Sequence, residues 1–266
     1  MSAAPGRPED GSRPALEGSR PALVFLHGIG GGQAGFDAHI AYFNARGWRA
    51  LAWDQCGYGD SPDLEPYTFA GVAQALAHWL SASRIESAVL VGHSMGGMIA
   101  LEFYAAFAPR VAALVLAHCS PAFGNNSGDF QRQFIAARTR PLDEGKTMGD
   151  VARSLVPAML GRQALPGAQA EAAALMAGVR SATYRNAMAE LVRFDRRPLL
   201  PAIAVPVLCL AAEDDKTAPP AVLSKMAEKI PGARYECLPG LGHLAPLEHP
   251  ARFCAAIETF IAGSLR

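Results

Sequence analysis

The sequence lacks an excess of charge of either sign, a long apolar run and a paired cysteine motif. Lysine plus arginine and aspartate plus glutamate each number 24, and charged residues make up only 18% of the chain. This balance creates no overall field that would attract nucleic acid or an anionic membrane, and it excludes a highly charged disordered chain. No apolar run approaches the roughly 20 residues of a membrane-spanning helix. We therefore expect neither nucleic acid nor a membrane as a partner.

The five cysteines are widely spaced and form no Cys-x-x-Cys pair. They predict free thiols in a reducing compartment, hence a cytoplasmic protein, because an odd and scattered set does not make a disulfide framework. No His, Cys and Asp residues cluster at metal-ligand spacing, so we expect no metal and no cofactor. Residues 1–21 are rich in Pro, Gly, Arg and Ser but have no apolar stretch typical of a secretory signal. We expect a flexible tail there.

What the sequence does contain is an alternation of short apolar runs with segments of helical spacing. Strands are expected at 22–26, 48–53, 87–91, 111–117, 205–212 and 234–238, and helices at 36–45, 69–83, 95–107, 221–229 and 250–262. Such alternation implies right-handed crossovers and a mostly parallel sheet with helices on both faces, an α/β fold. Residues 121–200 have only helical spacing. We call them the helical cap, because an insert there would lie as a lid over a core formed by residues 22–120 and 201–266.

The sharpest motif is Gly92-His93-Ser94-Met95-Gly96, which falls between a predicted strand and a predicted helix. A serine on such a tight turn needs small neighbours, and the turn raises its hydroxyl above the sheet edge at a helix N-terminus. Backbone N–H groups at that position favour developing negative charge. The motif in this context therefore predicts that Ser94 is a nucleophile.

A serine nucleophile needs a base, and the base needs a carboxylate. His243 lies in a loop just after the last predicted strand, from which its side chain can reach back over the sheet, and we take it as the base. His118, at the end of a strand, is placed to face the same cleft and is the second choice. The acid is expected among Glu213, Asp214 and Asp215, which follow the strand at 205–212 and precede His243. Chemistry alone does not choose between these three.

The glycine-rich turn at residues 28–32 has two interpretations. It follows the first predicted strand, as phosphate-binding loops do, but position 33 is glutamine where the dinucleotide motif requires glycine. A Walker motif is excluded because no Lys-Ser or Lys-Thr follows. We favour an oxyanion loop, in which the backbone N–H of Ile29 joins that of Met95 to hold a tetrahedral oxyanion.

Taken together, these motifs resemble those of the α/β-hydrolase family, and the likeness extends from Ala22 to the C-terminus. The family's markers stand here as His27-Gly28, Asp54-x-x-Gly57-x-Gly59-x-Ser61, Gly92-x-Ser94-x-Gly96 and Gly242-His243. The family places its acid three residues after a position usually held by glycine, here Ala212. The resemblance thus implies Asp215 as the acid, with Asp214 second. Two strands that usually precede the His-Gly strand have no convincing counterpart in residues 1–21.

Within the family, the layout resembles 3-oxoadipate enol-lactonases and related small-molecule esterases. This resemblance implies hydrolysis of a small carboxylic ester or lactone through an acyl-enzyme. A C–C bond hydrolase of ring-cleavage products, a thioesterase or a perhydrolase would use the same residues. A ligand-binding receptor on the same fold is the alternative that is not an enzyme. The sequence leaves the oligomeric state open.

The helical cap holds ten arginines and one lysine against seven acids, a surplus of four positive charges. One hypothesis is that Arg138 or Arg140 binds a substrate carboxylate, such as that of an enol-lactone acid; the alternative is that these arginines lie on solvated helix faces. His118 and Phe123 are further candidates for contact with substrate. Candidates for an apolar pocket wall are Phe123, Phe130, Phe134, Met148, Met159, Met176 and Met188.

Overall fold

The computed structural model describes residues 20–123 and 128–265. The tail expected at residues 1–21 falls outside the described residues except for its last two positions. The same is true of the question whether strands precede Ala22.

Within residues 20–123 and 128–265, six parallel strands form one sheet in the order β2-β1-β3-β4-β5-β6. The strands are β1 (Ala22–Leu26), β2 (Ala50–Trp53), β3 (Ala88–His93), β4 (Val111–Ala117), β5 (Val207–Ala212) and β6 (Arg234–Leu238). Every neighbouring pair runs parallel. The predicted α/β fold with a parallel sheet is therefore confirmed.

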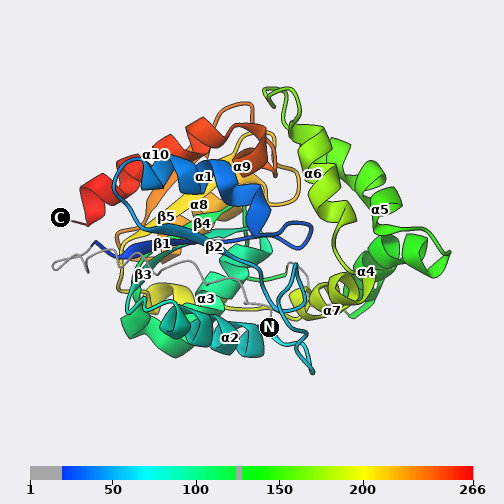
Figure 1. Ribbon diagram of the computed structural model, residues 1–266, viewed down its shortest axis with the longest axis horizontal. Helices are drawn as coiled ribbons and strands as arrows, with labels where there is room; N and C mark the ends of the chain where they lie inside the picture. The colour runs from blue at the N-terminus through cyan, green and yellow to red at the C-terminus, as the bar shows by residue number, and fades with distance from the viewer. Residues whose placement is uncertain (1–19, 124–127, 266) are drawn as a thin grey trace, which may run out of the picture.

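Helices cover both faces of this sheet, which explains why its strands, apart from the edge strand β6, are apolar on both sides. In β1, Leu23 and Phe25 pack into one core cluster, whereas Val24 and Leu26 pack into the other. One face is covered by α1 (Asp37–Asn44) and α10 (Pro250–Ser264), and the opposite face by α2 (Phe69–Ala82), α3 (Met95–Phe107) and α8 (Pro220–Lys229). Figure 1 shows blue α1 and red α10 together on one side of the sheet and teal α2 and α3 on the other.

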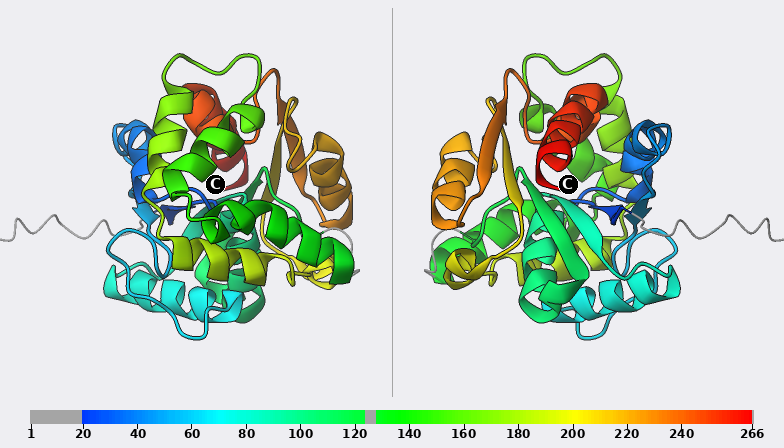
Figure 2. Two further views of the ribbon diagram at one scale, coloured as in Figure 1. Left: turned by 90° about the vertical axis from the view of Figure 1, so that its right-hand side faces the viewer. Right: turned by 90° about the vertical axis from the view of Figure 1, so that its left-hand side faces the viewer.

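The helical cap lies beside the sheet, at the right of Figure 1 and facing the viewer at the left of Figure 2. Its helices are α4 (Gly128–Asp143), α5 (Met148–Leu155), α6 (Ala168–Ala177) and α7 (Ser181–Leu191), with the 3₁₀ turns η3 (Val156–Met159) and η4 (Arg197–Ala202). Ala122 and Asp195 form an antiparallel bridge, and the Phe123 N–H donates to Phe194 O at 2.9 Å. The chain therefore leaves and re-enters the core at one place.

Shorter elements complete the fold: the 3₁₀ turns η1 (Gln33–Phe36) and η2 (Ala108–Arg110), and the short helix α9 (Ala245–Glu248). Three strands differ from their predicted bounds, and one of them, β5, begins at Val207 rather than at residue 205. β2 begins at Ala50 rather than Trp48, because the Trp48 N–H bonds to Phe43 O at 3.1 Å and so belongs to the turn after α1. β3 continues to His93, past the predicted end at 91, because Gly92 and His93 still pair with β4. This extension carries the sheet up to Ser94.

Candidate active site

Ser94 occupies a strained turn between β3 and α3, with φ 55° and ψ −120°. Residues other than glycine rarely adopt a positive φ, so the surrounding structure must enforce it. The Ser94 N–H donates to Ala117 O at 2.9 Å, and a Cβ on Gly96 would collide with the backbone carbonyl of Leu26. A Cβ on Gly92 would likewise collide with the Gly96 carbonyl. The two glycines of the motif are thus required by close backbone approach.

His243 links Ser94 to Asp215. Its Nε2 lies 2.9 Å from Ser94 Oγ, and its Nδ1 lies 2.8 Å from Asp215 Oδ2. His243 and Asp215 are only 2% and 3% exposed. With its Nδ1–H donated to the carboxylate, the imidazole presents the Nε2 lone pair to the Ser94 hydroxyl. The structure therefore brings the three predicted side chains into one hydrogen-bonded chain.

Asp215 is held as a carboxylate by its surroundings. Its Oδ1 accepts the backbone N–H groups of Thr217 at 2.7 Å and Ala218 at 2.9 Å. Burial raises the pKa of Asp215, but the charge and hydrogen bond of His243, together with His118 and the Ala218 N–H, outweigh it and leave the pKa below its ordinary value. The carboxylate stays ionised and free to orient His243.

The other two acids of this loop point elsewhere. Glu213 Oε2 accepts a hydrogen bond from Arg162 Nη2 at 2.5 Å, and Asp214 also pairs with the Arg162 guanidinium. Of the three adjacent acids, Asp215 is the one that contacts His243.

The loop after β1 packs against Ser94, since a Cβ on Gly28 would lie 3.2 Å from Ser94 Cβ. His27 fixes this loop: its Nδ1–H donates to Gly28 O at 2.8 Å, and its Nε2 accepts the Gln55 N–H at 3.1 Å. Within the part of the chain that the structure describes, the N–H groups of Ile29 and Met95 donate no hydrogen bond. They remain available to an oxyanion beside Ser94.

His93 and His118 surround His243 without touching Ser94 Oγ. His93 Nε2 lies 2.7 Å from His243 O, so the His93 ring donates a hydrogen bond to the backbone of His243. His118 is fully buried, and burial lowers its pKa to about 3. Its Nδ1 lies 4.0 Å from Asp215 Oδ2. His118 is therefore neutral, and its position does not match that of the base.

A cavity of about 640 Å³ opens over Ser94 and His243. Core loops and the helical cap both line it. The predicted wall residues that line it are Phe123, Phe130, Phe134, Met159, Met176 and Met188, and His118 lines it as well. Met148 is buried but is not part of this lining. The cavity is thus mostly apolar, with the nucleophile at one wall.

The structure places the two candidate arginines, Arg138 and Arg140, differently relative to the cavity. Arg138 lines the cavity, with its guanidinium carbon 3.4 Å from the centre of the Phe134 ring, and burial lowers its pKa. Arg140 does not line the cavity: its side chain is 75% exposed and pairs with Glu144 at 3.6 Å. The expectation that Arg140 contacts substrate is not supported, because it lies two residues further along α4 and projects from a different face.

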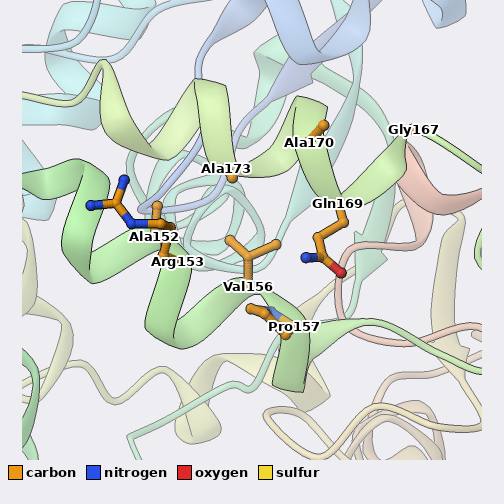
Figure 3. A pocket seen from close by; sticks show the side chains of 8 residues that line it. All are labelled: Ala152, Arg153, Val156, Pro157, Gly167, Gln169, Ala170 and Ala173. Carbon is orange, nitrogen blue, oxygen red and sulfur yellow. The ribbon is translucent and has the colours of Figure 1, made fainter.

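A second hollow, of about 490 Å³, lies between α5 and α6 in the helical cap. Figure 3 shows its lining, in which Val156 points toward Ala173. None of its eight lining residues is a serine, cysteine, histidine or acid. This hollow therefore offers binding space but no catalytic group.

Among the described residues, no three His, Cys, Asp or Glu side chains are grouped to hold a metal ion. No helix in the same part of the chain is long and apolar enough to cross a membrane.

Sequence reasoning missed Glu248 and Gly161. Glu248 is fully buried, and its carboxylate accepts the backbone N–H groups of Gly161, Gly242 and Leu244. The one signal in the sequence was an acid within a mostly apolar segment shortly after His243. Nothing in the sequence connected it with Gly161, which lies 87 positions away.

Residues 23–256 match the model of the alpha/beta hydrolase family. The chain is 26% identical to a pimeloyl-[acyl-carrier protein] methyl ester esterase of Neisseria meningitidis, over 92% of this chain and 94% of that protein. It is 28% identical to an sn-1-specific diacylglycerol lipase of Mus musculus, over 91% and 81%. Its fold resembles the enol-lactonase of Burkholderia xenovorans, with a TM-score of 0.82, 23% identity and coverage of 93% and 94%. The chain belongs to the alpha/beta hydrolase family, as its motifs predicted.

Proposed function

We propose that this protein is a serine hydrolase that cleaves a small carboxylic ester or lactone through an acyl-enzyme. The observation that carries the proposal is the hydrogen-bonded chain Ser94–His243–Asp215 at the wall of an apolar cavity. The ester-cleaving and lactone-cleaving relatives add support for this substrate class.

In the proposed reaction, Ser94 Oγ attacks the substrate carbonyl carbon while His243 Nε2 takes the hydroxyl proton. Asp215 stabilises the resulting imidazolium, and the N–H groups of Ile29 and Met95 bind the oxyanion; each such donor is worth roughly 3 kcal/mol. The tetrahedral intermediate collapses as His243 protonates the departing alkoxide. A water molecule then attacks the acyl-enzyme, with His243 again as the base, and the carboxylic acid leaves.

The test is hydrolysis of p-nitrophenyl acetate, butyrate and octanoate, together with a small lactone panel, by wild type and Ser94→Ala. Ser120→Ala is a matched control, because Ser120 lines the same cavity but donates its hydroxyl to Ala122 O at 2.6 Å. We expect Ser94→Ala to lose turnover and Ser120→Ala to keep it. Equal rates in wild type and Ser94→Ala would refute the proposal, and turnover of thioesters or C–C bonds alone would reassign the substrate.

We further propose that the substrate carries a carboxylate that Arg138 binds. Apart from histidines, the charged side chains in the cavity lining are Arg138 and Lys216, and the described lining has no aspartate or glutamate. No described acid pairs with Arg138. A half-buried guanidinium without a carboxylate loses hydration that an anionic ligand would replace.

A matched pair of esters tests this subsite: the p-nitrophenyl monoester of adipic acid and p-nitrophenyl hexanoate. We expect Arg138→Met to lower kcat/KM at least tenfold on the carboxylated ester and little on the neutral one. Arg140→Met, two residues away on the solvated side of α4, should change neither. Equal losses on both esters in Arg138→Met would contradict the proposed carboxylate contact.

The helical cap is proposed to act as the lid of this site, since residues of α4, α6 and α7 line the cavity over Ser94. We also propose a cytoplasmic location, because all five cysteines are free thiols and four of them are buried. Fractionation of the native host would test the location.

A further inference from the structure

The backbone around His243 is held by hydrogen bonds on every side. The His243 N–H donates to Met159 O at 2.8 Å, and His243 O accepts from the His93 ring at 2.7 Å. On either side of it, the N–H groups of Gly242 and Leu244 donate to the Glu248 carboxylate at 2.9 and 3.0 Å. The direction of the imidazole therefore depends on these partners.

Two of these partners join the His243 loop to residues 159–165 of the helical cap. We call this segment the cap linker. Met159 supplies the carbonyl that binds the His243 N–H. Glu248 Oε2 also accepts the Gly161 N–H at 2.8 Å, so one carboxylate binds both chains. Glu248 is fully buried, and no described lysine, arginine or histidine pairs with it. Its charge is balanced by backbone N–H groups alone.

Glycine makes this contact possible. A Cβ on Gly161 would overlap the carbonyl oxygen of Gly240, and one on Gly242 would overlap that of Met159. The two backbones therefore lie directly against each other with no side chain between them. Further along, the Leu165 N–H donates to Glu248 O at 2.9 Å. The contact runs the length of the cap linker.

From this geometry we propose that Glu248 and Gly161 are positioning residues for His243, and that the placement of the cap linker sets the alignment of the base with Ser94. The inference rests on the proposed function, in which His243 is the base. A displacement of about 1 Å in such an alignment costs on the order of 100-fold in rate. The helical cap would then contribute to the chemical step as well as to the pocket.

Glu248→Gln and Gly161→Ala test the proposal. The glutamine replaces one acceptor oxygen by an amide NH₂ that faces backbone donors, and the alanine forces the cap linker away from the His243 loop. In both variants we expect kcat to fall about 100-fold while KM changes less than threefold. Gly149→Ala, in α5 of the same cap, is the matched control, because its Cβ would meet no atom closer than 3.5 Å. It should keep wild-type kcat.

Wild-type kcat in folded Glu248→Gln and Gly161→Ala would overturn the proposal, as would a rise in KM alone. Gly161→Ala leaves the buried carboxylate and its bonds to the His243 loop in place, so it decides the matter if Glu248→Gln does not fold. A second readout needs no substrate: the far-downfield proton resonance of the His243 Nδ1–H, assigned by its loss in Asp215→Asn. We expect it to shift or broaden in Gly161→Ala. If wild type hydrolyses no ester or lactone, the proposed function fails, whereas an unchanged resonance in Gly161→Ala refutes the positioning role.

Discussion

Replacement of Asp215 by asparagine should disable the base while leaving the loop folded. The new side-chain carbonyl can still accept the N–H groups of Thr217 and Ala218, which Asp215 Oδ1 binds at 2.7 and 2.9 Å. The amide NH₂ then takes the place of Oδ2 and faces His243 Nδ1. Because two donors cannot bond to each other, His243 must carry its proton on Nε2, where it cannot accept the proton of Ser94.

The size of the effect follows from the loss of the correct tautomer. The same substitution in a serine protease triad lowers kcat about 10⁴-fold, which corresponds to roughly 5 kcal/mol in the activation free energy. The site here has the same bonds, with a buried acid at 2.8 Å from Nδ1. His118 gives no substitute base, since Ser94 Oγ bonds to His243. We therefore expect Asp215→Asn to lose about 10⁴-fold in kcat.

The assay is steady-state hydrolysis of p-nitrophenyl butyrate by wild type, Asp215→Asn and Asp214→Asn. Asp214 is the neighbouring acid, and it pairs with exposed Arg162 rather than His243. We expect Asp214→Asn to lose less than tenfold. A larger loss in Asp214→Asn than in Asp215→Asn, or more than a tenth of wild-type kcat left in Asp215→Asn, would refute the assignment of the acid.

Three further predictions concern stability. Burial lowers the pKa of His39 to about 4 and that of His118 to about 3, whereas an unfolded histidine titrates near 6.5. Above pH 6.5 these two histidines should leave the free energy of unfolding unchanged. As the pH drops below 6.5 toward the folded-state pKa, each histidine should lower the free energy of unfolding by about 1.4 kcal/mol per pH unit. Urea unfolding at pH 7, 6 and 5 measures this slope, and His39→Phe should remove one histidine's share; an unaltered slope would contradict the burial argument. Ser94→Gly should relieve the positive φ and raise the free energy of unfolding by about 1 kcal/mol over Ser94→Ala, measured by thermal melts, and an equal melting temperature would argue against strain. Gly96→Ala should destabilise the fold by more than about 2 kcal/mol because its Cβ meets backbone of β1, whereas Gly178→Ala, with no contact closer than 3.4 Å, should stay within about 1 kcal/mol.

The fold was predictable because its strands, apart from the edge strand β6, are largely buried on both faces. A run such as Ala22–Leu26 has no polar side chain, and this pattern predicts a central strand of a parallel sheet. Strand ends were less predictable, because they depend on single hydrogen bonds such as that of the Trp48 N–H to Phe43 O. Such hydrogen bonds cannot be predicted from the spacing of apolar residues.

The candidate nucleophile and base were visible because each carries local chemistry: Ser94 between two glycines, and His243 after the last strand. Asp215 could be chosen among three acids only through the family's spacing. The sequence could not show which of Arg138 and Arg140 lines the cavity. Residues two apart on a helix face different directions, and the sequence does not show which direction faces the cavity. The contacts of Glu248 could not be predicted from the sequence, because they include the backbone N–H of Gly161, which lies 87 positions away in the chain.

The bridge between Ala122 and Asp195 has a consequence for how this enzyme can diversify. Because both ends of the helical cap meet at one point, a replacement of another length needs to span only that short gap. The entropic cost of closing a loop rises by only about 0.6 kcal/mol for each doubling of its length. Caps of very different size and shape can therefore be inherited on one unchanged sheet. If the proposed positioning role holds, the backbone of Met159 and Gly161 is the part of the cap that must be kept, because it lies against the loop of His243.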